Sequence, residues 1–113
     1  MKKDLYSLSE EAIAHFDKSL ESDPVVRQLI DAAAEEWRER FRPKFRSVEG
    51  CRRALLARSA LLGTRLGLER EWRMADLPSL ARYLCRRVEI RVAELDAAEG
   101  KDGTLESGLQ KVP

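Results

Sequence analysis

The chain has 113 residues, of which 43% are hydrophobic and 36% are charged, so it is long enough to bury one core and too short for two. This apolar content excludes a chain that is disordered throughout. Its longest charge-free stretches fall far short of the roughly 18 residues that a bilayer span needs, and residues 1–4, three of which are charged, lead into an acidic segment. We therefore expect a soluble cytoplasmic protein that is neither exported nor membrane-embedded.

Two helices are predicted in the first third of the chain. The first has a candidate N-cap at Ser7 or Ser9, and its stripe at helical spacing comprises Tyr6, Ser9, Ile13, Phe16 and Leu20. The second follows residues 22–24, where a Ser-Asp cap precedes proline at the first helical position, and we expect Pro43 to end it near Arg42. Its stripe comprises Val26, Leu29, Ile30, Ala33, Trp37 and Phe41.

Two more helices follow. Ser47 can cap the third, whose core stripe comprises Val48, Cys51, Leu55, Ser59, Leu62 and Leu66. This helix is apolar nearly all round, which indicates a central helix or one shared with a partner, because further apolar residues lie outside the stripe at Ala54, Leu56, Ala57, Ala60 and Leu61. The fourth restarts at residues 76–78 and has the clearest stripe, which comprises Leu77, Leu80, Ala81, Leu84, Val88, Val92 and Leu95.

The end of the chain differs in composition from the rest. After Ala98, glycines stand among polar residues, a composition that cannot hold a packed element. We therefore predict a single helical domain over residues 1–98 and a flexible polar tail over residues 99–113. The expected fold class is all-α, either a small four-helix bundle or an irregular helical array, with a disordered C-terminal tail.

Residues for catalysis or metal binding are scarce. Cys51 and Cys85 are the only cysteines, neither belongs to a C-x-x-C pair, and we expect two reduced thiols. His15 is the sole histidine, so one chain cannot supply the usual four ligands of a structural zinc site. There is no P-loop, dinucleotide fingerprint or nucleophile elbow. We expect a protein that is not an enzyme and that holds no metal or cofactor.

Charge is segregated along the chain. The net charge is −5 over residues 1–36, +9 over residues 37–92 and −3 over residues 93–113. All fifteen basic residues of the middle segment except Lys44 are arginines, whose planar side chains pair bidentately with phosphate or carboxylate. The middle segment is therefore predicted to bind anions.

Two groups of residues in this segment are candidate binding residues. The first lies where the second helix ends and comprises Arg38, Arg40, Arg42, Lys44 and Arg46. The second lies on the side of the fourth helix away from its core stripe and comprises Arg82, Tyr83, Arg86, Arg87 and Ile90. Four of the latter follow the spacing i, i+3, i+4, i+7, which lines up one exposed strip for a partner.

Three interpretations of the arginines are open. We expect a non-enzymatic helical subunit that binds RNA or DNA backbone phosphates within a larger complex, with Tyr83 stacking on a base. The alternative is a protein-binding adaptor or inhibitor, including inhibitors of phage type, that presents the strip on the last helix to an acidic protein surface. The third is that the acidic first and second helices neutralise the arginines within the fold.

The third helix adds an expectation of self-association. If its extra apolar residues are not covered within the monomer, they would pair two copies about a two-fold axis. The residues concerned are Leu56, Ala57, Ala60 and Leu61.

Overall fold

The computed structural model describes the backbone of residues 7–109 and the side chains of residues 7–99. Its four long helices are α1 (Glu10–Leu20), α2 (Pro24–Glu36), α4 (Val48–Glu69) and α5 (Leu77–Leu109). Short segments join them: the π-helix η1 (Trp37–Phe41), the single turn α3 (Arg42–Phe45) and the 3₁₀ turn η2 (Met74–Asp76). No strand occurs within residues 7–109, and the predicted all-α fold is confirmed.

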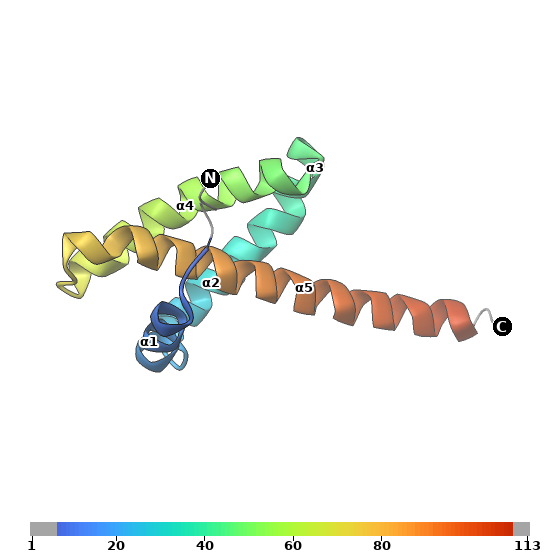
Figure 1. The fold of residues 1–113 in the computed structure, drawn as a ribbon. Helices are drawn as coiled ribbons and strands as arrows, with labels where there is room; N and C mark the ends of the chain where they lie inside the picture. Colours follow the sequence, from blue (N-terminus) through green and yellow to red (C-terminus); the bar gives the residue numbers. More distant parts are fainter. Residues whose placement is uncertain (1–6, 110–113) are drawn as a thin grey trace.

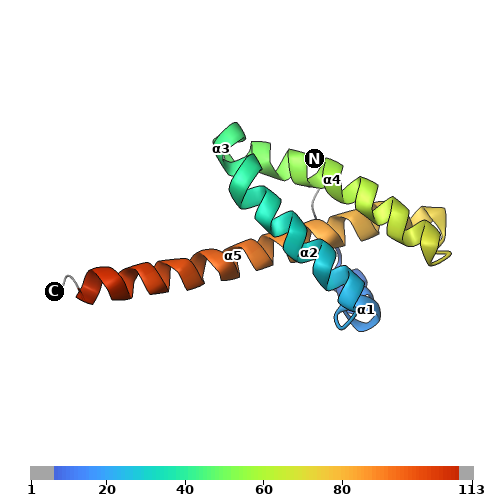
Figure 2. The same cartoon turned by 180° about the vertical axis from the view of Figure 1, so that it is seen from behind.

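The helices form a small bundle with an irregular arrangement. α4 and α5 are antiparallel, meet at η2 and diverge toward α3 (Figures 1 and 2). α2 runs from α1 to η1 and passes across α5, and α1 also packs against α5. The C-terminal part of α5 extends beyond the other helices (Figure 1). α5 therefore contacts each of the other long helices.

The predicted flexible tail covers residues 99–113. The backbone of α5 continues to Leu109, whereas residues 110–113 and the side chains from residue 100 onward lie outside what the structure describes. The tail and the domain boundary beside it stay predictions.

Each predicted N-cap region supplies a capping side chain. The Ser9 hydroxyl accepts a hydrogen bond from the Ala12 N–H at 3.1 Å. The Asp23 carboxylate accepts from two N–H groups in the first turn of α2, after which Pro24 occupies the first helical position. The Ser47 hydroxyl accepts from the Gly50 N–H at 3.0 Å. These bonds satisfy amide groups that have no partner within the helix, and they fix where α1, α2 and α4 begin.

The predicted stop at Pro43 is wrong. The helical conformation does not end near Arg42 but continues through η1 and α3 to Phe45. At the end of η1 the Arg42 N–H donates to the carbonyl of Trp37, five residues earlier, so this turn is wider than a turn of α-helix. The wider turn directly precedes Pro43, whose ring it can accommodate. Pro43 then lies in the first turn of α3, where its missing N–H is tolerated. The chain leaves the helix at Arg46, which has a left-handed φ of 61°.

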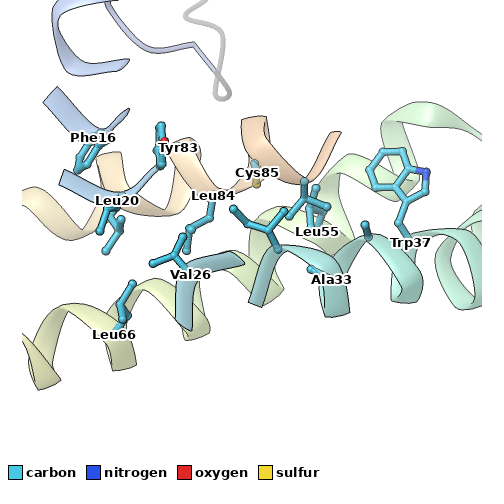
Figure 3. Close-up of a cluster of buried hydrophobic side chains, with 14 of the residues drawn as sticks. Phe16, Leu20, Val26, Ala33, Trp37, Leu55, Leu66, Tyr83, Leu84 and Cys85 are labelled. Atoms are coloured by element: carbon cyan, nitrogen blue, oxygen red, sulfur yellow. The ribbon is translucent and has the colours of Figure 1, made fainter. Parts of the chain in front are cut away.

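The buried core joins the long helices (Figure 3). The predicted stripes supply most of it, including Phe16, Leu20, Val26, Ile30, Ala33, Trp37, Leu55, Leu66, Leu80, Leu84 and Val88. Cys51 and Cys85 are free thiols and both are buried within it. Burial raises the pKa of the Cys85 thiol to about 11. Burial therefore keeps the Cys85 thiol protonated.

Tyr83 was expected on an exposed strip, and the structure overturns this. Its side chain is 0% exposed because α1 covers that side of α5, with the Phe16 ring centroid 5.1 Å from that of Tyr83. The Tyr83 hydroxyl donates to Asp17 Oδ1 at 2.6 Å and accepts from Arg87 Nη1 at 2.7 Å. Burial, aided by the bond to the Asp17 carboxylate, raises the pKa of Tyr83 to about 12. Tyr83 is a core residue that ties α1 to α5.

Replacing Tyr83 should therefore destabilise the fold. We expect Tyr83→Ala to lower the free energy of unfolding by about 3–5 kcal/mol, as for other buried aromatic residues. Tyr83→Phe should cost about 1 kcal/mol, because Asp17 and Arg87 lose their shared partner. Urea denaturation measures both, with the exposed Arg86→Ala as a control expected to stay within about 0.5 kcal/mol of the unaltered protein. A Tyr83→Ala variant as stable as this control would contradict the assignment.

Candidate functional site

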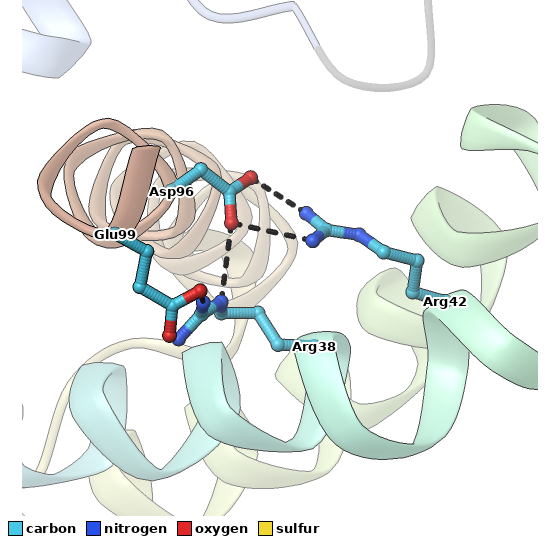
Figure 4. Close-up of polar contacts among 4 residues, drawn as sticks. All are labelled: Arg38, Arg42, Asp96 and Glu99. Carbon is cyan, nitrogen blue, oxygen red and sulfur yellow. Dashed lines mark hydrogen bonds and ion pairs between the residues drawn. The ribbon is translucent and has the colours of Figure 1, made fainter. Parts of the chain in front are cut away.

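The first predicted basic group is partly occupied by ion pairs with α5. Arg42 donates through two nitrogens to the Asp96 carboxylate, at 2.7 and 3.2 Å. Arg38 donates to the same carboxylate through Nε at 3.1 Å and also pairs with Glu99 (Figure 4). The Arg42 hydrogen bond, with help from Arg38, lowers the pKa of Asp96 below its ordinary value of 3.8. Both arginines therefore already have carboxylate partners.

Other arginines are also paired across the fold. Arg58 donates to Glu36 at 2.7 and 3.0 Å, Arg91 donates to Asp31 at 3.0 Å, and the further pairs between elements are Arg70 with Asp23 and Arg52 with Glu89. The Arg58 hydrogen bond lowers the pKa of Glu36, and that of Arg70 lowers the pKa of Asp23. Acidic side chains of α2 and α5 thus neutralise much of the cationic middle segment.

The remaining predicted site residues lie in two separate regions, around α3 and on α5. Arg40, Lys44 and Arg46 are exposed around α3 and make no ion pair within the part of the chain that the structure describes. On α5, Arg86 is exposed, Arg82 is half-buried, and Arg87 has a side chain only 22% exposed. The structure does not gather all the predicted arginines into one unpaired basic face.

Ile90 and Arg87 line a groove between α2 and α5. The groove has a volume of about 350 Å³ and is lined by Arg27, Ile30, Asp31, Arg87, Ile90, Arg91 and Glu94. Ile30 is buried at its α2 side, and Ile90 is 43% exposed. The groove therefore combines two isoleucines with three arginines and two acids.

The two walls of the groove share one sequence pattern. In α2, Arg27 stands three residues before Ile30 and four before Asp31, and in α5 residues 87, 90 and 91 repeat this spacing with Arg, Ile and Arg. The spacing places the three side chains of each wall on one face of their helix. The ion pair between Asp31 and Arg91 connects the walls.

The three arginines of the groove differ in how many hydrogen bonds and ion pairs their guanidinium groups make. Arg27 is exposed and makes no ion pair with any described residue. Arg87 is held by the Tyr83 hydroxyl and lies 3.9 Å from Asp17. Arg91 is paired with both Asp31 and Glu94. Arg27 is thus the groove arginine most available to an anionic group, and Arg87 stands fixed on the other wall beside Ile90.

Sequence reasoning identified two of the seven residues that line this groove as binding residues. Arg87 and Ile90 were predicted as binding residues, whereas Ile30 was assigned to the core, and Arg27 and Arg91 were missed. The signal that could have found them is the repeated Arg-x-x-Ile-charged pattern, with opposite charges at its fifth position. The pattern alone does not show that the two segments contact each other, because they are about sixty residues apart in the sequence.

Comparisons with other proteins assign no family to the chain. Family models, curated proteins and solved structures give no significant match to the chain. Among the described residues, no group of three or more His, Cys, Asp and Glu side chains is arranged to hold a metal ion. No helix in the described part is both long and apolar enough for a membrane span.

The paired carboxylates make stability depend on pH. Arginine partners lower the folded-state pKa of Asp96, Asp23 and Glu36, so the stabilisation is fully present above the ordinary pKa of these groups and is lost as pH falls through the folded-state pKa. We expect the free energy of unfolding to decrease between about pH 5 and pH 2. Urea titrations at a series of pH values measure this decrease.

The Asp96→Asn variant shows how much Asp96 contributes to the pH dependence of stability. The variant should lose no more than about 1 kcal/mol at pH 7, because the pair is partly exposed, and its stability should fall less steeply at acidic pH. Glu35→Gln, an exposed side chain outside the ion pairs, is the matched control. An identical pH profile for Asp96→Asn and the unaltered protein would show that the pairs of Asp96 are not maintained in solution.

Proposed function

We propose that the protein is a non-enzymatic protein-binding module, an adaptor or inhibitor, that holds an acidic segment of its partner in the α2–α5 groove. The observation that carries this proposal is that Ile90, which is 43% exposed, lines the groove together with arginines from both walls. A half-exposed apolar side chain beside arginines has the composition of a protein interface centre, where apolar anchors and arginine supply much of the binding energy.

The chemistry of the groove specifies the kind of segment. Arg27 offers guanidinium donors to a carboxylate, and arginine with carboxylate forms the strongest such pairs when both nitrogens engage. Ile90 and the edge of Ile30 offer a surface to an aliphatic or aromatic side chain. The volume of about 350 Å³ lies at the lower end for ligand pockets, which suits one anchoring side chain and its neighbours. The expected segment places an apolar residue next to an acidic one.

Nucleic-acid backbone binding is the second candidate. It is supported by the exposed Arg40, Lys44 and Arg46 around α3, which make no ion pair within the described part of the chain. It is weakened by the carboxylate pairs of Arg38 and Arg42, because affinity for phosphates rests on the number of cations free to replace counterions. The buried Tyr83 is also withdrawn from the base-stacking role expected of it.

Peptide selection tests the groove directly. A library of random peptides selected on the folded protein should enrich sequences with Asp or Glu beside Leu, Ile or Phe. Arg27→Glu and Ile90→Ala should each weaken binding of a selected peptide by about tenfold, equivalent to roughly 1.4 kcal/mol, as expected for interface anchors. Arg86→Glu, on the same helix but outside the groove, is the control and should bind normally.

A second measurement separates the two candidates. Fluorescence anisotropy with labelled single-stranded RNA and duplex DNA should show little binding at physiological salt. Binding with a log–log salt slope of roughly −2 to −5, insensitive to Ile90→Ala and abolished by Arg40→Glu with Arg46→Glu, would assign the protein to nucleic acid. Failure of the peptide selection together with that result would reject the protein-binding proposal.

A further inference from the structure

α4 carries a second apolar face that the other described residues leave uncovered. Its inner face supplies Cys51, Leu55, Ser59 and Leu66 to the core. On its outer face Leu61 is 68% exposed and Leu68 is 57% exposed. Ala57, before Leu61, and Thr64, between the two leucines, are exposed on the same face. An ordinary surface helix is polar on this side, so the outer face needs an explanation other than solvation.

The spacing on this face is that of a coiled-coil seam. The positions are 54, 57, 61, 64 and 68, occupied by Ala, Ala, Leu, Thr and Leu. The intervals alternate between three and four residues, which keeps the side chains along one line where another helix can pack. The small residues at three of the five positions would let a second backbone approach closely. The face is therefore shaped for a helix rather than for a loop.

A hollow beside the seam adds a site for an inserted side chain. It has a volume of about 250 Å³ and is lined by Glu36, Phe41, Ala54, Ala57, Arg58 and Leu61. Phe41 of η1 forms the wall opposite α4, so the hollow exists because the helical chain continues through the π-turn beside α4. An apolar side chain from a docked helix could fill it.

The charges flanking the seam specify the partner. Arg53 and Arg65 are exposed on either side of the apolar line, and Arg58 lies on the same side as Arg65. Arg58 is paired with Glu36, and Arg53 forms an exposed pair with Glu49 one turn earlier on α4, whereas Arg65 makes no ion pair with a described residue. The charged residues directly beside the apolar line are nevertheless all arginines, which favour a partner with acidic residues at its own flanking positions.

The same charges disfavour a second copy of this chain. In an antiparallel pair centred on Leu61, Arg58 of one copy lies beside Arg65 of the other, because the two residues stand on the same side of the seam at nearly equal distances from its centre. In a parallel pair, Arg53 meets Arg58 of the other copy across the seam. Either arrangement brings like charges together, whereas an acidic helix opposes them with carboxylates.

From these features we infer that the outer face of α4 is a docking site for an amphipathic helix of another protein, with acidic residues flanking its apolar stripe. The site shares no residue with the α2–α5 groove. It therefore does not rest on the function proposed for that groove. With both surfaces occupied, the chain would bridge two protein segments.

Two synthetic helical peptides test the inference. Each has about 21 residues in three heptads with leucine at the a and d positions, and the flanking e and g positions carry glutamate in one and lysine in the other. In fluorescence anisotropy the glutamate peptide should bind saturably and the lysine peptide at least about tenfold more weakly. Arg53→Glu with Arg65→Glu should reverse this preference, and Leu61→Glu should abolish binding of the glutamate peptide.

Controls make the outcome decisive. If Leu61→Glu alters the circular dichroism spectrum, the milder seam variant Leu68→Gln replaces it. Leu68→Gln should also weaken binding of the glutamate peptide. Ile90→Ala should bind the glutamate peptide normally, which separates this site from the groove. Equal binding of both peptides, or binding of neither, would overturn the inference. So would sedimentation showing a dimer of the unaltered protein that Leu61→Glu converts to a monomer, because the occupant would then be a second copy.

Discussion

The packing of other helices around α5 is the constraint on which the rest of the structure depends. α4 covers one side of α5, α2 crosses it, and α1 closes a third side over Tyr83. A helix covered from several directions must be apolar on more than one face, which is why Tyr83 and Cys85 are buried together with the main stripe. The α2–α5 groove lies where α2 crosses α5, and the residues that line it come from these two helices.

The arginine pairs act within this packing and contribute mainly to its geometry. Partly exposed ion pairs contribute only about 0–1 kcal/mol each, so the core and not the charges supplies most of the stability. Their placement is nevertheless specific. Asp96 receives arginines from both η1 and α3, and Asp31 receives Arg91 at the point where α2 and α5 cross. The pairs therefore favour one crossing arrangement over others in which the same apolar stripes could pack.

Local signals in the sequence were sufficient for the fold class and for most element boundaries. The caps at Ser9, Asp23 and Ser47 and the stripe from Leu77 to Val92 depend on neighbouring residues alone, and the structure confirms them. Tyr83 was misplaced because a stripe identifies only one buried face, and its partner Asp17 is 66 residues away. Pro43 was misjudged because a single π-turn can absorb a proline that would end an α-helix.

The candidate site was less predictable than the fold for the same reason. Charge segregation drew attention to the arginine-rich segment, but net charge cannot show which cations acquire a carboxylate partner from another helix. Arg42 and Arg87 looked alike in the sequence, yet one forms a bidentate pair with Asp96 and the other is held by a buried tyrosine. Arg27 lies in the acidic part of the chain, where no basic site was sought.

The two buried thiols have a practical consequence for studying these surfaces. Cys51 and Cys85 lie on α4 and α5, the helices that bear the two proposed binding faces, and both are buried, although Cys51 also lines a hollow beside Trp37 and Arg42. The raised pKa of Cys85 further suppresses its thiolate. Alkylation of Cys85 therefore requires transient opening of the packing between α4 and α5, so the labelling rate of this thiol reports that opening without any introduced probe. A partner that binds α4 or α5 and suppresses this opening would slow the alkylation of Cys85 without contacting the thiol. The alkylation rate would therefore also report whether a partner is bound.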